Sequence, residues 1–319
     1  MAIEHLRHTS LQLTRREFTA MGATALATTA LAVGLTGSAN AAMLEDNWID
    51  AHVHVWTPDT KKYPLSSKFK VADMQPPSFT PEELFAHCKP VGVKRIVLIQ
   101  MSFYEFDNRY MLDMMAAHPG VFSGVGIVDH QASDVAVKVR ELRKAGVRGL
   151  RVYSESVAKP SKAMDNLWKI AADENISICN LINPADIGAV DKLCERFPST
   201  KVVIDHFARI GVSGTIESEP LAALCRLARF PTVHLKTSAF YALGKKAAPY
   251  EDLAPMIRQV RDAFGAERLM WASDCPYQVQ GSHAYEPAIA LVRDKLDFLT
   301  AAEKQSILRG TAEKVFFNS

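Results

Sequence analysis

The chain has 319 residues, of which 48% are hydrophobic and 23% are charged, a balance typical of a globular protein with a large core. Its 37 Lys and Arg residues and 35 Asp and Glu residues give a net charge of +2, which gives no reason to expect a nucleic acid or a membrane surface as partner. A charged small-molecule substrate would therefore have to be held by a few local side chains.

The first 41 residues have the pattern of an export signal. Arg15 and Arg16 precede an apolar stretch rich in Ala, Thr and Gly. Ala39 and Ala41 are the small residues that a signal peptidase requires at its cleavage site. The pattern resembles a twin-arginine signal cleaved after Ala41, which implies that the folded protein is exported to the periplasm. A membrane anchor is the alternative, but threonines and glycines make this stretch a poor membrane span. Residues 42–319 would then form the mature protein, with no stable membrane association.

Eight short runs rich in Val, Ile and Leu predict buried strands, at residues 48–56, 93–100, 122–129, 147–153, 176–182, 201–207, 233–240 and 269–277. Helix-period segments separate them, and both "TPEE" (80–83) and "TAAE" (300–303) predict a capped helix start. Alternating strands and helices predict a parallel sheet, because parallel strands need long crossover connections. Eight such units predict an α/β fold of one domain, a closed (β/α)8 TIM barrel.

Several other site classes lack support in the sequence. No Gly-rich dinucleotide motif or phosphate-binding loop follows any predicted strand. The five cysteines are an odd number without Cys-x-x-Cys spacing, so they are expected to be small core residues rather than a disulfide framework or a zinc knuckle. The sequence contains no clear pattern that indicates the oligomeric state. A homodimer is expected only because many barrel enzymes are dimers.

Two histidines interrupt the first predicted strand, "WIDAHVHVW". Residues i and i+2 of a strand share a face, so His52 and His54 are expected to point the same way, together with Asp50. Ile49 and Ala51 would then face the helices. Taken alone, the strand is equally consistent with two core histidines that are bonded to neighbouring carbonyls.

Two later strands end in residues that suit the same site. His206 ends the sixth strand in "VVIDHF", and Asp274 ends the eighth in "WASDCPY". The carboxyl ends of barrel strands meet at one face, where barrel enzymes keep their active sites. Three imidazoles and one carboxylate predict a site for one divalent ion such as Zn²⁺ with an open position for water.

At this point the sequence resembles the amidohydrolase superfamily, and within it the amidohydrolase-2 group that includes lactone hydrolases. The resemblance covers nearly the whole mature chain and rests on "DAHVHVW", "GVKRIVLIQ", "GLRVY", "RFPSTKVVIDHFARIG", "HLKTSAFYAL", "FGAERLMWASDCPY" and "LTAAEKQSILRGTAEKVF". It implies a (β/α)8 fold with His52, His54, His206 and Asp274 as site residues. The resemblance adds a named family to the site that the strand ends already predict.

The sequence departs from the wider superfamily at two strands. Binuclear members take a bridging Lys or Glu from the fourth strand, where this chain has Arg151 and Tyr153. Mononuclear members often add a histidine from the fifth strand, where this chain has Cys179 and Asn180. A second metal is therefore not expected, and a site that holds only substrate and water stays open.

The resemblance implies hydrolysis of a small, anionic lactone by water attack. Asp274 would act as general base and then acid, and His206 as a further catalytic group beside the oxyanion. Polar residues near the strand ends are expected to bind the substrate: Arg151, Tyr153, Arg209, Lys236, Tyr104 and Tyr277. A metal-dependent nonoxidative decarboxylase and a solute-binding barrel without catalysis are the alternatives.

Overall fold

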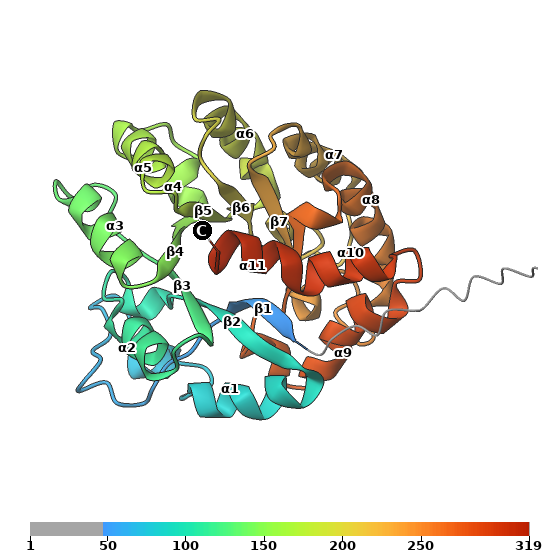
Figure 1. Cartoon of the computed structure of the whole chain (residues 1–319), viewed down its shortest axis with the longest axis horizontal. Helices are drawn as coiled ribbons and strands as arrows, with labels where there is room; N and C mark the ends of the chain where they lie inside the picture. The colour runs from blue at the N-terminus through green and yellow to red at the C-terminus, as the bar shows by residue number, and fades with distance from the viewer. Residues whose placement is uncertain (1–46, 319) are drawn as a thin grey trace, which may run out of the picture. The chain divides into compact units, whose positions relative to one another are not determined.

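The computed structural model describes residues 47–318, so the expected export signal lies outside the described residues. Eight parallel strands pair in sequence order and confirm the predicted barrel (Figure 1). Most strands end earlier than predicted, because their polar last residues leave the sheet and form the loops of one barrel end. The strands are β1 (Trp48–Val53), β2 (Val93–Ile99), β3 (Phe122–Gly126), β4 (Val147–Tyr153), β5 (Ser177–Leu181), β6 (Val202–Ile204), β7 (Val233–Ser238) and β8 (Leu269–Ala272).

The first and last strands meet and bring the sheet back onto itself. The Asp274 amide donates to the His52 carbonyl at 2.9 Å, and the His54 amide donates to the Cys275 carbonyl at 2.8 Å. Both hydrogen bonds lie beyond the last residue of β8, at the carboxyl ends of the two strands. The closure thus places Asp274 beside the two histidines of β1.

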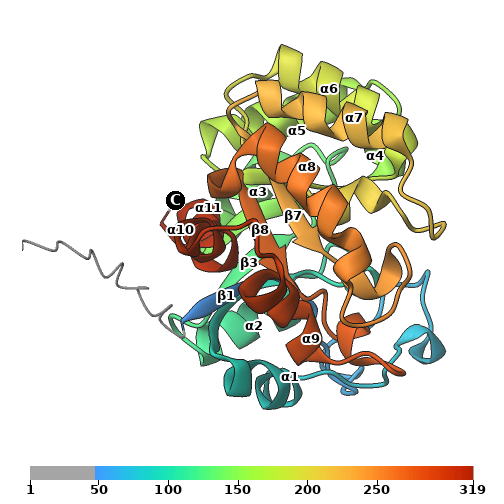
Figure 2. The same ribbon diagram turned by 90° about the vertical axis from the view of Figure 1, so that its right-hand side faces the viewer.

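Helices surround the strands, as Figure 2 shows from the side. The two predicted capping boxes are present, with Thr80 paired to Glu83 and Thr300 to Glu303. No helix within residues 47–318 is long and apolar enough to cross a membrane. The helices are α1 (Pro81–Cys88), α2 (Arg109–Ala117), α3 (Val135–Lys144), α4 (Ser154–Val157), α5 (Lys162–Asp173), α6 (Ile187–Arg196), α7 (Ser218–Arg226), α8 (Ala254–Phe264), α9 (Tyr285–Ala290), α10 (Ala301–Gln305) and α11 (Thr311–Phe316).

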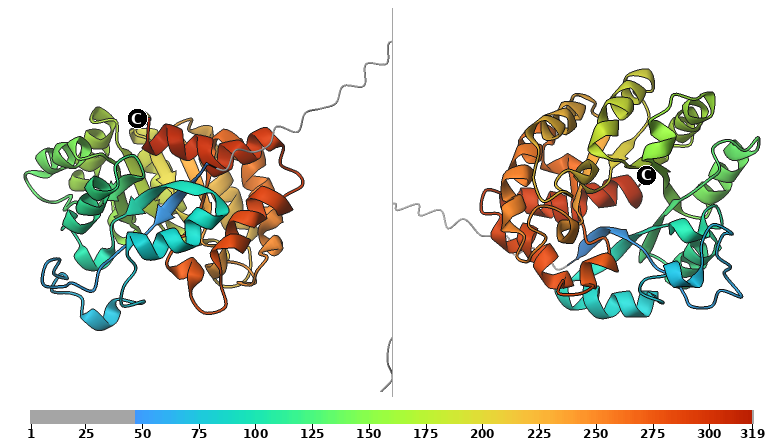
Figure 3. Two further views of the ribbon diagram at one scale, coloured as in Figure 1. Left: turned by 60° about the horizontal axis from the view of Figure 1, so that its bottom comes forward. Right: turned by 180° about the vertical axis from the view of Figure 1, so that it is seen from behind.

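The core has two layers. The larger layer fills the space between strands and helices, and the smaller one fills the barrel interior, where α11 contributes Ala312, Val315 and Phe316. The Ser123 hydroxyl in β3 donates to the Phe316 carbonyl at 2.6 Å and fixes this helix to the sheet. Figure 3 shows α10 and α11 at one end of the barrel and the loop after β1 at the other. The amino end is therefore closed by apolar side chains, and the carboxyl end is left for the site.

Candidate active site

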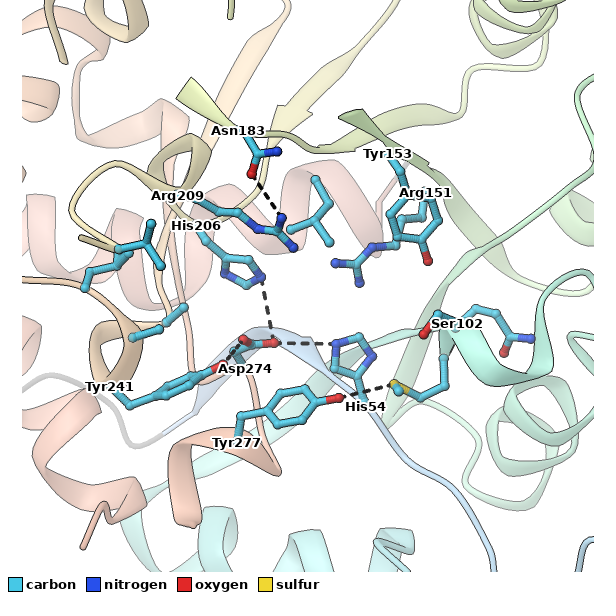
Figure 4. A pocket seen from close by; sticks show the side chains of 17 residues that line it. His54, Ser102, Arg151, Tyr153, Asn183, His206, Arg209, Tyr241, Asp274 and Tyr277 are labelled. Carbon is cyan, nitrogen blue, oxygen red and sulfur yellow. Dashed lines mark hydrogen bonds and ion pairs between the residues drawn. The ribbon is translucent and has the colours of Figure 1, made fainter. Parts of the chain in front are cut away.

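Four residues predicted to form the site meet at the carboxyl end of the barrel. Asp274 Oδ1 lies 3.5 Å from Nε2 of His52, 3.5 Å from Nε2 of His54 and 3.7 Å from Nε2 of His206. The Nε2 atoms of His52 and His54 are 3.3 Å apart. All four residues are at most 5% exposed. Figure 4 shows His54, His206 and Asp274 pointing toward one another.

A bulge in β1 aims its two histidines at this point. Asp50 pairs with Ile96 of β2, and Val53 pairs with Leu98, so three residue steps in β1 match two in β2. One extra residue in a strand interrupts the alternation of its side chains between the two faces. The strand therefore supplies apolar residues to the interior in its first half and both imidazoles in its second half.

Asp50 does not share a face with the two histidines, so this part of the prediction is wrong. Its carboxylate accepts from the Tyr285 hydroxyl of α9 at 2.6 Å and from the Ser273 amide at 2.9 Å. Ile49 and Ala51, which were expected to face the helices, lie in the barrel interior. Asp50 instead ties β1 to the segment after β8, and burial raises its pKa to about 6.

The loops that carry His206 and Asp274 adopt backbone angles that L-residues rarely take. Values of φ are +52° at His206, Phe207 and Ala208, +61° at Arg209 and +65° at Asp274. Each left-handed residue costs roughly 1–2 kcal/mol, so the surrounding packing must hold these turns in place. Phe207 and Ala208 are fully buried in the turn that residues 206–209 form. The flanking residues of the turn, His206 and Arg209, both line the pocket.

Backbone and hydroxyl partners set the direction of two imidazoles. His54 Nδ1 lies 2.9 Å from the Ile99 carbonyl, which can only accept, so this nitrogen carries the proton of the neutral ring. His206 Nδ1 lies 2.7 Å from the Ser238 hydroxyl, which donates to the Lys236 carbonyl at 3.5 Å. The hydroxyl therefore accepts from His206, and both rings turn an Nε2 lone pair toward Asp274.

The site holds one carboxylate beside two rings, His52 and His206, that are neutral at neutral pH. Burial lowers the pKa of His206 to about 4 and the pKa of His52 well below its usual value. Burial alone would raise the pKa of Asp274, but His206 and the other imidazoles hold it well below its usual range, because an imidazole that gains a proton as pH falls keeps the neighbouring carboxylate ionised. The Tyr241 hydroxyl donates to Asp274 Oδ2 at 2.7 Å, and burial and the Asp274 charge raise the pKa of this phenol. Asp274 is therefore an oriented base.

A buried ion pair supports His52 from below. Lys236 Nζ lies 3.0 Å from Asp205 Oδ1 and 3.1 Å from His52 Nδ1, and neither Lys236 nor Asp205 is exposed. Burial would raise the pKa of Asp205, but Lys236 holds it well below its usual value. Lys236 points into the barrel as predicted, but it lies beneath His52 and does not line the pocket. Sequence reasoning missed Asp205, although it directly precedes His206.

A cavity of about 500 Å³ opens above the four site residues. Arg151, Tyr153, Arg209 and Tyr277 line it as predicted (Figure 4). Arg151 Nη1 lies 3.3 Å from His52 Nε2, and Arg209 Nη1 donates to Asn183 Oδ1 at 3.1 Å. Among the described residues, no carboxylate forms an ion pair with Arg151 or Arg209. The pocket therefore carries positive charge that a bound anion would neutralise.

The remaining predicted residues lie away from the pocket. Tyr104 is 3% exposed and packs against Phe103 and Tyr110, so the structure does not support its expected contact with substrate. Asn180 in β5 donates to the Ile178 carbonyl at 3.1 Å, and β5 adds no group to the Asp274 cluster. The five cysteines are free. Tyr241 is one of the polar pocket residues that sequence reasoning missed, together with Gln100, Ser102 and Asn183, although it follows the seventh strand as Tyr153 ends the fourth.

One divalent ion fits the geometry of His52, His54 and Asp274. Their ligand atoms lie within 4.8 Å of one another, and their separations of 3.3 and 3.5 Å are close to the edge of about 3.3–3.4 Å expected for tetrahedral zinc. The tautomer of His54 leaves its Nε2 free to bind an ion. Arg151 competes for the His52 Nε2 lone pair, since its guanidinium can only donate.

Comparison with known proteins places this site in a family. A family model described as amidohydrolase matches residues 49–317. L-fucono-1,5-lactonase of Burkholderia ambifaria is 29% identical over 245 residues, which cover 74% of this chain and 82% of that protein. The 2-pyrone-4,6-dicarboxylate hydrolase of Comamonas testosteroni is 28% identical over 241 residues, which cover 72% of this chain and 76% of that protein.

A solved structure supports the shared fold. An amidohydrolase of Burkholderia multivorans with bound zinc has a TM-score of 0.69 and 21% identity, over 85% of this chain and 99% of that one. The family match begins in β1, where the two histidines lie, and ends just beyond α11, which closes the barrel. The chain belongs to the amidohydrolase family.

Proposed function

We propose that the protein hydrolyses a small, anionic lactone. The observation that carries this proposal is the position of Asp274, an oriented carboxylate among three imidazoles, on the floor of a pocket with two arginines that lack a carboxylate partner. A carboxylate or sulfonate on the substrate would supply that partner. The names of two relatives, a lactonase and a hydrolase of a pyrone dicarboxylate, support a cyclic ester as the substrate.

The reaction needs one base that later acts as an acid. Asp274 removes a proton from a water molecule, whose oxygen attacks the lactone carbonyl carbon. Arg151 lies on the same wall as the histidines and is placed to stabilise the oxyanion. When the ring C–O bond breaks, the leaving alkoxide takes the proton from Asp274, and the product is a hydroxy acid. Tyr241 keeps the carboxylate aimed through both steps.

We further propose zinc as the ion that His52, His54 and Asp274 would hold, where it would act as a Lewis acid and lower the pKa of a bound water. The zinc-bound relative supports this assignment. Metal analysis of protein purified without chelator is expected to find about one ion per chain by ligand count. Loss of the ion in His54→Ala would support the assigned ligands. Full activity of the metal-free protein would reject a catalytic metal.

A panel of lactones tests the reaction itself. Acid released on ring opening is followed with a pH indicator for the wild type, Asp274→Asn and Asp297→Asn, the last being an exposed carboxylate between α9 and α10 as matched control. We expect turnover to fall about 10³-fold in Asp274→Asn, because a general base contributes about 10²–10⁴-fold, and to stay unchanged in the control. Equal turnover in all three proteins would exclude Asp274 as the base.

A second comparison tests the preference for anions. In Arg209→Met, kcat/KM for a carboxylated lactone is expected to fall about tenfold, the loss expected for one charge-assisted hydrogen bond. The same ring without its carboxylate should be unaffected. A loss of equal size on both substrates would mean that Arg209 does not bind the acid group.

A further inference from the structure

A second cavity adjoins the pocket on the side of Arg151. It has a volume of about 340 Å³ and shares Ser102, Arg151 and Tyr153 with the pocket as common lining. Figure 4 shows these three residues together on one side of the site. Loops that follow β1, β2, β3 and β4 form the rest of its wall. A ligand at Asp274 thus has a second cavity next to it, on the other side of these three residues.

A third cavity, of about 370 Å³, extends the second toward α2 and α3. The two cavities share Phe106, Ile127, Val128 and Asp129 as lining. Together they extend from the three residues shared with the pocket to α2 and α3 at the barrel rim. We call these two cavities the rim groove and define it by the residues that line them.

Phe106 lies where the two cavities of the rim groove meet, and half of its surface is exposed. The loop around it is fixed by side-chain hydrogen bonds. Gln100 Nε2 donates to the Asp107 carbonyl at 2.7 Å, and Asn108 Nδ2 donates to the Phe106 carbonyl at 3.0 Å. Hydrogen bonds that hold this loop in one conformation reduce the entropy that a ligand would lose on binding to the exposed ring of Phe106.

Charge distinguishes the rim groove from the pocket. The arginines of the pocket lack carboxylate partners, whereas cations of the groove are paired with its own acids: Lys68 with Glu105, Arg109 with Asp107 and Lys138 with Glu141. Asp129 and Asp134 add further negative charge. A second anionic group is therefore disfavoured in the groove, and its exposed apolar surface suits an uncharged group.

We propose that the rim groove binds an uncharged aromatic or alkyl arm of the substrate, which contacts Phe106 while the acid group of the same molecule pairs with Arg209 and its lactone carbonyl faces Arg151. The inference rests on the proposed function and narrows it to lactones that carry both an acid group and an apolar substituent. A substrate of this kind fills the pocket and the groove at once.

The binding of analogues that cannot be hydrolysed tests whether the groove binds the uncharged arm, independently of whether the protein hydrolyses lactones. Tetrahydropyran-2-carboxylate and a phenyl-substituted congener are titrated into the full chain by calorimetry. We expect the phenyl compound to bind at least about tenfold more tightly, from burial of one ring face. Phe106→Ala should remove that advantage and leave the affinity for the parent compound unchanged. Val137→Ala, which truncates a similarly exposed apolar side chain of α3 outside the groove, is the matched control.

Each outcome decides a different point. Equal affinity of the two analogues for the wild type, or the same loss for both in Phe106→Ala, overturns the groove and leaves the lactonase proposal standing. If neither analogue binds, both proposals fall. If the analogues behave as expected but no lactone is turned over, the groove stands as a binding site and the hydrolysis proposal fails.

Discussion

The two ends of the barrel are built from the same strands but hold opposite chemistry. At the amino end, Ile49 and Ala51 of β1 pack against Phe316 of α11 in a purely apolar layer. At the carboxyl end, His52 and His54 of the same strand face a carboxylate, arginines and strained loops. Residues at the amino end therefore contribute mainly to stability, and residues at the carboxyl end contribute mainly to catalysis. Mutations at the first end should lower the free energy of unfolding, and mutations at the second should lower kcat.

Lys236 marks the boundary between the two ends. Its Nζ lies 5.5 Å from the ring centre of Phe316 on one side and 3.1 Å from His52 on the other. Lys236→Met is expected to destabilise the fold by about 4 kcal/mol, because it leaves the Asp205 charge buried and unpaired, and to reduce activity as well. Chemical denaturation with and without the second change Asp205→Leu measures the effect. The double variant should regain stability but not activity, and a neutral single variant would contradict this role.

At the amino end, Phe316→Ala is expected to cost about 3–4 kcal/mol through the cavity that it leaves. Phe316 is 1% exposed and does not line the pocket. Denaturation curves measure the loss, and kcat per folded molecule should not change. A large fall in kcat would show that the two ends are coupled.

His234 gives the amino end a dependence on pH. Burial lowers its pKa to about 4, so the unfolded chain binds a proton first as pH falls below about 6.5. Stability that is present above pH 6.5 is then lost as pH falls toward 4. Between pH 7 and pH 5, His234→Gln should therefore lose about 2 kcal/mol less than the wild type. Parallel curves for the two proteins would contradict this.

The smallest expected effect lies at the carboxyl end. Tyr241→Phe removes the hydrogen bond to Asp274 Oδ2 and should lower kcat about tenfold, the loss of roughly 1.4 kcal/mol, with little change in unfolding temperature. Kinetics on the best lactone of the panel and a thermal melt make the comparison. An unchanged kcat would show that Asp274 does not need this partner.

The sequence predicts the eight strands and the four central site residues because both leave a local pattern. Apolar runs mark the strands, and polar residues at their carboxyl ends mark the site. His206 and Asp274 are found in this way although they are far apart in the chain and close in space. The lengths of the strands are less predictable, since polar residues that end the ladder look like part of it.

Other features depend on partners that the local sequence does not reveal. The bulge in β1 arises from its pairing with β2, so simple alternation misplaces Asp50. The short helical turn Ser102–Tyr104 directs Tyr104 into the core under α2, and a rule about strand ends cannot detect this turn. The role of Asp205 depends on its ion pair with Lys236, a residue of the neighbouring strand, and the local sequence does not reveal this pair.

The helix that closes the amino end also bears on how the protein is made. Strand β1 comes first among the described elements, and α11, which covers its interior face, follows all eight strands in the chain. A nascent chain that has already produced all eight strands still lacks Val315 and Phe316, and its interior stays open to water. The barrel interior should therefore be closed only after α11 has been synthesised, and deletion of Val315 and Phe316 should be more damaging than loss of a surface loop.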